Sequence, residues 1–298
     1  MFMPSKPHKT IHKRLAAGVD RGGTHTRIVL INGRGSELKR VSHPTSHIRL
    51  LPDLIVKTAL EWELEPHVPV VIATRGAMTK KWKKPFLLKK LKGKVNLLDV
   101  ISDAHAAYLA AHGSGDGALL IAGTGSVVFL KTGGGGFNKI GGHGPSEGDP
   151  GSGLWLGTRF LKSVKTGKKK LDRRSRAAYA ALAISSAQRG DSAARELIHE
   201  AHEHLLELLA AAVKKHLARA ALMPPSQRKQ RGAKSLKPLK VALAGGLMQN
   251  VFFRRTFIVR TRGRFASARL AFTGLKHTAE YAAARLAMEN FYGRNKGT

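Results

Sequence analysis

The sequence predicts an α/β protein of two lobes, each built on a mixed β-sheet. A Gly-Thr turn with an apolar strand on either side occurs at Gly23–Thr24 and again at Gly123–Thr124. Each copy opens a series in which strands come first and helices follow. The length of 298 residues is ample for two hydrophobic cores. Duplication, element order and length therefore all favour two related lobes.

The duplicated element is a β-hairpin with a glycine-rich turn. Apolar runs precede the two turns at Leu15–Val19 and Gly117–Ala122, and apolar strands follow them at Thr26–Ile31 and Ser126–Leu130. Glycines let backbone N–H groups approach an anion closely, and a threonine hydroxyl adds a further donor. Two such turns facing each other would hold the polyphosphate of a nucleotide.

Hydrophobic periodicity predicts the other elements in order. The first lobe is expected to have strands near 15–20, 26–31, 37–42, 68–73 and 95–99, with helices near 50–64, 84–92 and 103–112. The second is expected to have strands near 117–123, 126–131, 137–141 and 238–244, with helices near 153–166, 174–188 and 191–219. An alanine-rich helix is expected at 278–291.

Composition excludes several classes of site. The chain has no cysteine, which rules out disulfides, thiolate zinc and iron–sulfur ligation. The basic segment 1–14 is followed by only a short apolar stretch, so no signal peptide is expected, and no run approaches 18 apolar residues. We therefore expect a cytoplasmic protein with no membrane contact.

Four segments resemble motifs of the sugar kinase, Hsp70 and actin superfamily. Gly18–Thr26 resembles its first phosphate motif, Ala122–Ser126 its second, and Val241–Asn250 the strand-Gly-Gly-helix that packs on adenosine. Gly141–Trp155 resembles a segment of the branch that holds N-acetylglucosamine kinases and the BadF/BadG/BcrA/BcrD ATPases. The motifs occur in order, and the resemblance covers nearly the whole chain.

The resemblance implies a two-lobed actin-like ATPase fold, which is ribonuclease H-like, with a nucleotide cleft between duplicated mixed-sheet lobes. The lobes would be residues 1–112 and 113–276, with a final helix at about 277–298 on the first. ATP and Mg²⁺ are the implied cofactors. The expected ATP contacts are Gly22, Gly23, Thr24, Thr26, Gly123, Thr124, Gly125, Ser126, Gly245, Gly246 and Asn250.

Asp20 is the candidate metal ligand. It precedes the first turn, whereas Leu120 stands at the equivalent place before the second. Mg²⁺ bound to phosphates keeps several waters and takes one or two carboxylates. A side chain that merely caps the turn is the structural alternative for Asp20.

Asp103 is the candidate catalytic residue. Phosphoryl transfer needs a group that takes the proton of the acceptor hydroxyl. Asp99 and Asp103 both follow the strand near 95–99, and the resemblance places the catalytic aspartate at the head of the next helix, at Asp103. Asp99 is expected to be structural. A helix cap without chemistry is the alternative for Asp103.

The resemblance also implies sugar contacts. These would come from Asp103 itself, from Thr124 in the second turn, and from Gly142 and Asp149 in the glycine-rich segment. The family's asparagine after the third strand is Ser46 here, and an aromatic residue is replaced by His143. Both departures leave the identity of the sugar open.

A formal net charge of +33 is the feature that a kinase does not explain. Such a field attracts nucleic acid without sequence preference. No recognition motif is legible and the basic residues occur throughout, which favours a compositional bias. A basic nucleic-acid-binding protein on a kinase-like scaffold remains the alternative from another class.

The sequence thus predicts an ATP-dependent kinase acting on a hexose or hexosamine, such as N-acetylglucosamine or glucosamine, and a homodimer by resemblance. A BadF-type ATPase without a sugar acceptor is the nearer alternative.

Overall fold

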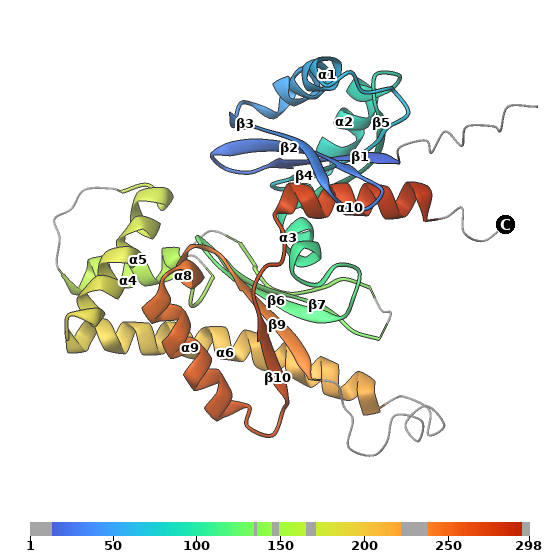
Figure 1. Cartoon of the computed structure of the whole chain (residues 1–298). Helices are drawn as coiled ribbons and strands as arrows, with labels where there is room; N and C mark the ends of the chain where they lie inside the picture. Colours follow the sequence, from blue (N-terminus) through green and yellow to red (C-terminus); the bar gives the residue numbers. More distant parts are fainter. Residues whose placement is uncertain (1–13, 134–135, 145–148, 165–170, 222–237, 294–298) are drawn as a thin grey trace, which may run out of the picture. The chain divides into compact units, whose positions relative to one another are not determined.

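The computed structural model describes residues 14–133, 136–144, 149–164, 171–221 and 238–293. The chain forms two compact units (Figure 1). The first consists of residues 1–110 and 277–298, and the second of residues 111–276. Each unit holds one five-stranded mixed sheet, so the predicted α/β class and the pair of mixed sheets are confirmed.

The first sheet has the strand order β3-β2-β1-β4-β5. Strands β1, β2 and β3 form an antiparallel meander, and β1, β4 and β5 run parallel. All six residues of the strand Pro69–Thr74 are buried, as expected for a parallel strand covered on both faces. The bounds are β1 Leu15–Arg21, β2 His25–Asn32, β3 Glu37–Pro44, β4 Pro69–Thr74 and β5 Asn96–Ser102.

Helices cover both faces of this sheet. One buried cluster joins Val19 and Ile72 of the sheet to Ile55 of α1 and Leu87 of α2. Another joins Val71 to α3 and to the alanines of α10. The bounds are η1 Ile48–Leu50, α1 Leu51–Glu61, α2 Lys83–Leu91, α3 Asp103–His112 and α10 Ala279–Tyr292.

Helix α10 lies unusually close to β1. A Cβ atom on Gly18 would lie 2.0 Å from the carbonyl oxygen of Glu280 and 2.3 Å from the amide nitrogen of Ala284. Arg40 of β3 forms an ion pair with the buried carboxylate of Glu280. A glycine in the strand and an arginine two strands away therefore hold the C-terminal helix against the first hairpin.

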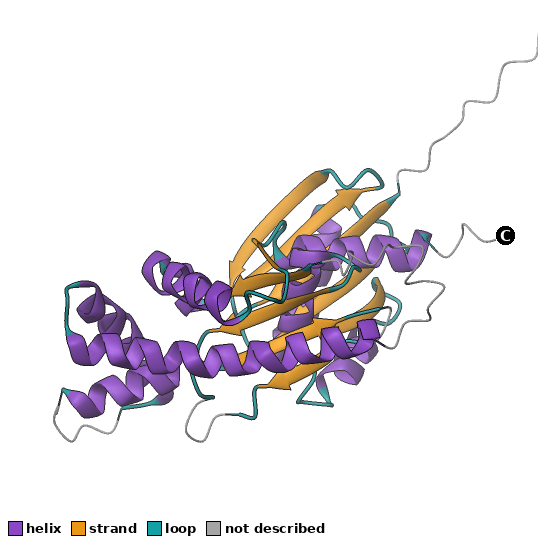
Figure 2. Ribbon diagram, turned by 90° about the horizontal axis from the view of Figure 1, so that it is seen from below, coloured by secondary structure: helices purple, strands orange, loops and turns teal. Residues whose placement is uncertain are grey.

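The second sheet has the order β10-β9-β6-β7-β8. Its core joins alternate residues of β6 and β7, such as Leu120 and Val128, to the helices α4, α5, α6 and α9. The long helix α6 packs along this sheet (Figure 2). The strands are β6 Gly117–Ala122, β7 Ser126–Lys131, β8 Asn138–Gly141, β9 Leu239–Ala244 and β10 Leu270–Thr273. The helices are α4 Gly153–Ser163, α5 Arg173–Gln188, α6 Ser192–Ala221, α8 Gly246–Gln249 and α9 Val251–Arg264.

The predicted elements are confirmed to within a few residues, apart from two that were not predicted. Helix α9 and strand β10 follow the glycine pair. The sequence of α9 has five arginines among its 14 residues, and the apolar side chains that it buries fully in the core are Phe253 and Phe257. Four half-buried residues make β10, which is too short for a clear alternation.

No helix among the described residues is long and apolar enough to cross a membrane.

His202 is a buried histidine in the core of the second unit, 1% exposed and packed on the rings of Phe253 and Phe257. Burial first, then the charges of Arg260 and His199, lower its pKa from 6.5 to about 3. Between these two pH values the folded state therefore binds fewer protons at His202 than the unfolded state does. The free energy of unfolding is not reduced by His202 above pH 6.5, and it declines as the pH falls from 6.5 toward 3.

We expect His202→Leu to flatten this decline, because a full proton's difference contributes about 1.4 kcal/mol per pH unit. Denaturant unfolding between pH 4 and 7 measures the slope, with the exposed His67→Gln as control. Equal slopes for His202→Leu and the parent protein would contradict the assignment.

Candidate functional site

The first Gly-Thr turn connects β1 to β2 and is tied to the end of β3. The amide of Gly22 donates to the carbonyl of His25 at 3.0 Å, which closes the turn. The Thr45 amide donates to the carbonyl of Thr24 at 2.8 Å, and the Thr45 hydroxyl donates to the carbonyl of Gly22 at 3.2 Å. Gly23 and Thr24 are exposed, whereas Thr26 is buried in β2 and its hydroxyl meets that of Thr45 at 3.4 Å. The turn is therefore braced from behind, with its glycines accessible.

Asp20 lies in β1 directly before this turn and is 9% exposed. Burial first, and then the carboxylates of Glu280 and Asp103, raise its pKa to about 6, while Arg27 at 3.9 Å opposes the shift. Among the described residues, the hydrogen bonds that close the turn do not involve the Asp20 carboxylate. The turn-capping alternative therefore finds no support there.

Asp103 is the first residue of α3, immediately after β5. The hydroxyl of Ser102 accepts the amide of His105 at 3.0 Å, so Ser102 provides the side-chain cap of the helix. Among the residues that the structure describes, the carboxylate of Asp103 accepts one hydrogen bond, from the amide of its neighbour Ala104 at 3.0 Å, and the side chain is half-buried. The capping role weighed for Asp103 thus belongs mainly to Ser102. Asp99 forms an ion pair with Lys84 at 2.6 Å, in agreement with a structural role.

Ser46 follows β3 and is exposed. Its carbonyl accepts the guanidinium of Arg21 at 2.5 Å, which links the segment after β3 to the end of β1. Ser46, the first turn, Asp20 and Asp103 therefore belong to one region of the first unit.

The second Gly-Thr turn connects β6 to β7 and is braced by α4. The Gly123 amide donates to the carbonyl of Gly125 at 2.9 Å. The carbonyls of Gly123 and Thr124 accept the first amides of α4, from Gly153 at 2.6 Å and Leu154 at 3.4 Å. Thr124 is exposed.

Asp149 connects the glycine-rich segment to this turn. One carboxylate oxygen accepts the amide of Ser126 at 3.3 Å and the other accepts the amide of Gly144 at 3.2 Å. The Ser126 hydroxyl donates to the carbonyl of Pro150 at 2.6 Å, so this side chain is buried and already occupied. A Cβ on Gly125 would lie 2.6 Å from the Asp149 carboxylate. Asp149 thus has a bracing role, and each oxygen keeps capacity for a further donor.

The predicted adenosine motif lies beside the same turn. Gly245 has φ +96°, and a Cβ there would lie 2.4 Å from the carbonyl oxygen of Ala122. Gly246 is exposed and opens α8. The Asn250 side chain accepts the amide of Phe253 at 3.1 Å, so it caps α9. The structure thus brings the second turn and the glycine pair together, and gives Asn250 a structural bond.

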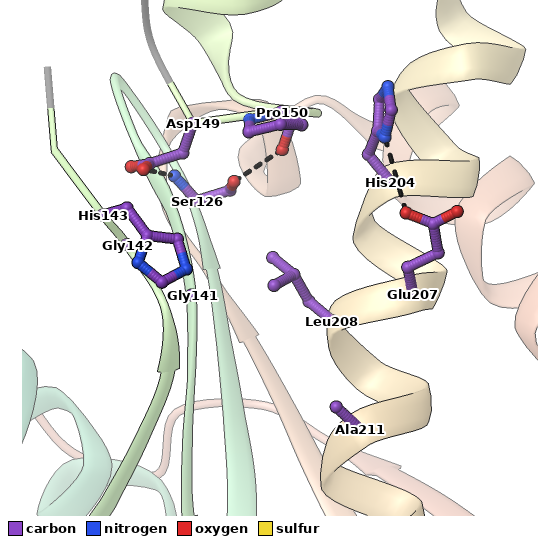
Figure 3. A pocket seen from close by; sticks show the side chains of 10 residues that line it. All are labelled: Ser126, Gly141, Gly142, His143, Asp149, Pro150, His204, Glu207, Leu208 and Ala211. Atoms are coloured by element: carbon purple, nitrogen blue, oxygen red, sulfur yellow. Dashed lines mark hydrogen bonds and ion pairs between the residues drawn. The ribbon is translucent and has the colours of Figure 1, made fainter. Parts of the chain in front are cut away.

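A cavity of about 240 Å³ lies beside Ser126 at the end of the second turn (Figure 3). Gly142 and Asp149, two of the predicted sugar contacts, line it on one side. On the other side α6 contributes His204 and Glu207, whose side chains form an ion pair at 3.6 Å if the histidine is protonated. Sequence reasoning missed both α6 residues, because a polar pair one turn apart on a long helix is an ordinary surface pattern.

Among the described residues, no group of three or more histidine, aspartate or glutamate side chains is arranged to hold a metal ion. A metal carried on nucleotide phosphates needs fewer protein ligands, so a single carboxylate such as Asp20 fits that mode. Residues 145–148 of the glycine-rich motif lie outside the described residues.

Three of the solved structures that match this chain illustrate the shared fold. A protein from Chromobacterium violaceum, provisionally assigned as an N-acetylglucosamine kinase, matches with a TM-score of 0.60 and 21% identity, over 92% of this chain and 99% of its own. A protein from Listeria monocytogenes, provisionally assigned as an N-acetylmannosamine kinase, matches with a TM-score of 0.60 and 15% identity, over 95% and 100%. A ROK family protein from Streptococcus pneumoniae, solved with sucrose, matches with a TM-score of 0.59 and 14% identity, over 95% and 100%.

These likenesses concern the fold, and they confirm the predicted actin-like architecture. A comparison with curated proteins gave no significant match. The model of the BadF/BadG/BcrA/BcrD ATPase family matches residues 17–262, which include both Gly-Thr turns, Asp103 and the glycine pair. The chain therefore belongs to the BadF/BadG/BcrA/BcrD ATPase family.

Proposed function

We propose that this protein is an ATP- and Mg²⁺-dependent carbohydrate kinase that phosphorylates a hydroxyl of a hexose or hexosamine. The observation that carries the proposal is the position of Asp103 and the small part that its carboxylate takes in capping α3. It lies at the head of α3, its expected capping bond is made by Ser102, and its electrostatic neighbour is Asp20. A carboxylate relieved of capping beside the first phosphate turn suits a base that receives a hydroxyl proton.

In the proposed reaction, the acceptor oxygen attacks the γ-phosphorus of ATP, the bond from that phosphorus to the β–γ bridging oxygen breaks, and ADP leaves. Asp103 takes the hydroxyl proton. Mg²⁺ would neutralise charge on the phosphates, and Asp20 would hold it directly or through water.

The binding roles follow the accessibility of each group. The exposed Gly23 and Thr24 and the half-buried Gly22 in the first turn, and the exposed Thr124 in the second, would donate to phosphate oxygens. Gly245 and Gly246 would lie against adenosine. Thr26, Ser126 and Asn250 already make hydrogen bonds within the protein, so we assign them to shaping these turns.

Acceptor contacts are proposed for Ser46, Asp103, Thr124, Gly142 and Asp149. The cavity beside Gly142 and Asp149 supports the last two. The sugar-kinase assignments of two fold neighbours support a carbohydrate acceptor, while the family description supports ATP hydrolysis as such. An ATPase that acts without a sugar is accordingly the second candidate.

A panel of hexoses and aminosugars tests the proposal. At least one sugar should raise ADP release well above its background rate, with a phosphorylated sugar formed in equal amount. ADP release and product mass are measured together. A flat response across the panel, with ATP binding intact, would favour the second candidate.

A further inference from the structure

Four basic side chains gather at one edge of the first sheet: Arg21, Arg75, Lys80 and Lys83, hereafter the basic cluster. Arg21 ends β1 and Arg75 directly follows β4, and these parallel neighbours are in register, with Arg21 opposite Thr74. Lys80 and Lys83 follow in the segment that enters α2. Since the carboxyl ends of parallel strands form the ligand edge of α/β sheets, the cluster lies where a substrate is expected.

Hydrogen bonds to backbone carbonyls hold two of these cations in place without neutralising them. The Lys83 ammonium donates to the carbonyl of Arg75 at 2.5 Å, and the Arg21 guanidinium donates to the carbonyl of Ser46 at 2.5 Å. Lys83 is only 8% exposed. In the described part of the chain none of the four forms an ion pair, whereas the nearby Lys84 is paired with Asp99.

This arrangement is electrostatically unfavourable by itself. Burial lowers the pKa of Lys83, and the charges of Arg21, Lys80 and Arg75 lower it further, against an opposite effect of Asp103. Burial and Arg75 likewise lower the pKa of Arg21. Like charges that lie close together at a partly buried position raise the electrostatic free energy of the folded protein. A bound anion would remove this unfavourable term.

The position of the cluster bears on which anion it receives. Arg21 donates a hydrogen bond to the carbonyl of Ser46, a proposed acceptor contact. The charge of Asp103, the proposed base, acts to raise the pKa of Lys83. Arg75 extends toward the first turn, since a Cβ on Gly23 would lie 3.0 Å from its guanidinium nitrogen. The cluster thus lies around the proposed acceptor groups, and two of its members, Arg21 and Arg75, also adjoin the first turn.

We infer that the sugar acceptor carries an oxyanion, a carboxylate or a phosphate, which the basic cluster binds. The inference rests on the proposed kinase function and narrows its substrate class. Guanidinium groups suit such a ligand because their parallel N–H bonds match two oxygens of a carboxylate or phosphate. The transferred group and the bonds that change are those given above, so the oxyanion serves binding alone.

The test compares each neutral acceptor with an anionic counterpart: glucose against glucuronate and glucose 6-phosphate, and N-acetylglucosamine against its 6-phosphate. We expect kcat/KM to be about 10- to 100-fold higher for an anionic member, the usual effect of a charge-assisted hydrogen bond. Calorimetry without nucleotide should give the same order of affinities. Neutral acceptors that equal or exceed their anionic partners would overturn the inference while leaving the kinase proposal intact.

The matched variants are Arg75→Gln and Lys81→Gln. Both remove one positive charge from the same exposed segment, but Lys81 is outside the basic cluster. Arg75→Gln should lower kcat/KM for the anionic acceptor about tenfold more than for the neutral one, and Lys81→Gln should lower both equally little. An equal loss for both acceptors in Arg75→Gln, accompanied by a higher KM for ATP, would assign the cluster to the nucleotide and overturn the inference. If no acceptor of either charge is phosphorylated, the inference and the kinase proposal both fail.

Discussion

Asp103→Asn is expected to lower turnover by about 10²- to 10⁴-fold, the contribution of a positioned acid–base group. The amide keeps the size of the side chain and can still accept the Ala104 amide, but it cannot take a proton. Nucleotide affinity should persist, because Asp103 is not among the proposed phosphate contacts. Steady-state ADP release in the presence of the best acceptor measures the effect, and equilibrium binding of ATP provides the comparison.

The contrasting variant is Asp20→Asn. It should weaken the use of Mg²⁺-ATP while the affinity for the acceptor changes little, because its proposed partner is the metal. Ser102→Ala controls for folding, since removing a helix cap costs about 0.5–2 kcal/mol without touching the base. Near-normal turnover in well-folded Asp103→Asn would remove the base assignment and make Asp149 the next carboxylate to test.

Gly18→Ala is expected to reduce the free energy of unfolding by about 3 kcal/mol, at the upper end of the usual cost of overpacking. The new methyl group would meet backbone atoms of α10, the carbonyl oxygen of Glu280 at 2.0 Å and the amide nitrogen of Ala284 at 2.3 Å. A backbone cannot rotate away as a flexible side chain can, so the helix must move off β1. Thermal and urea unfolding measure the change.

Gly263→Ala is the matched control for this prediction. Gly263 is exposed within α9, and a Cβ there would meet nothing within 4 Å. The same substitution should therefore stabilise the protein by about 0.5–1 kcal/mol through helix propensity alone. If Gly18→Ala were as stable as the parent, α10 would not be packed on β1 as described.

Much of the fold was accessible from local patterns. The two hairpins combine apolar strands with glycine turns, and helices such as α1 and α4 have a clear apolar face, so their type followed from the sequence. Helix α9 and strand β10 were missed because α9 has many charges around a narrow aromatic stripe and β10 is short. Their stability comes from a core supplied by other elements.

For the candidate site, the sequence by itself determined which residues belong to the two turns, to the head of α3 and to the glycine pair. Residue type and spacing along one segment are enough for that. Only the tertiary structure decided that Ser102 provides the main side-chain cap of α3, and that Asp149 braces two backbone segments. Both outcomes depend on the directions of hydrogen bonds, which spacing does not specify.

The basic cluster shows the same division. In the sequence Arg21 and Arg75 are two of 52 basic residues, separated by a hairpin, a helix and a strand. Parallel pairing of β1 with β4 brings the ends of these strands to one edge, and packing places Lys83 against the Arg75 carbonyl. Composition alone therefore determined that the protein is strongly basic. Strand pairing and packing decided that the basic cluster lies near enough to the proposed catalytic carboxylate for the two to interact electrostatically, since only the fold sets distances between residues far apart in the chain.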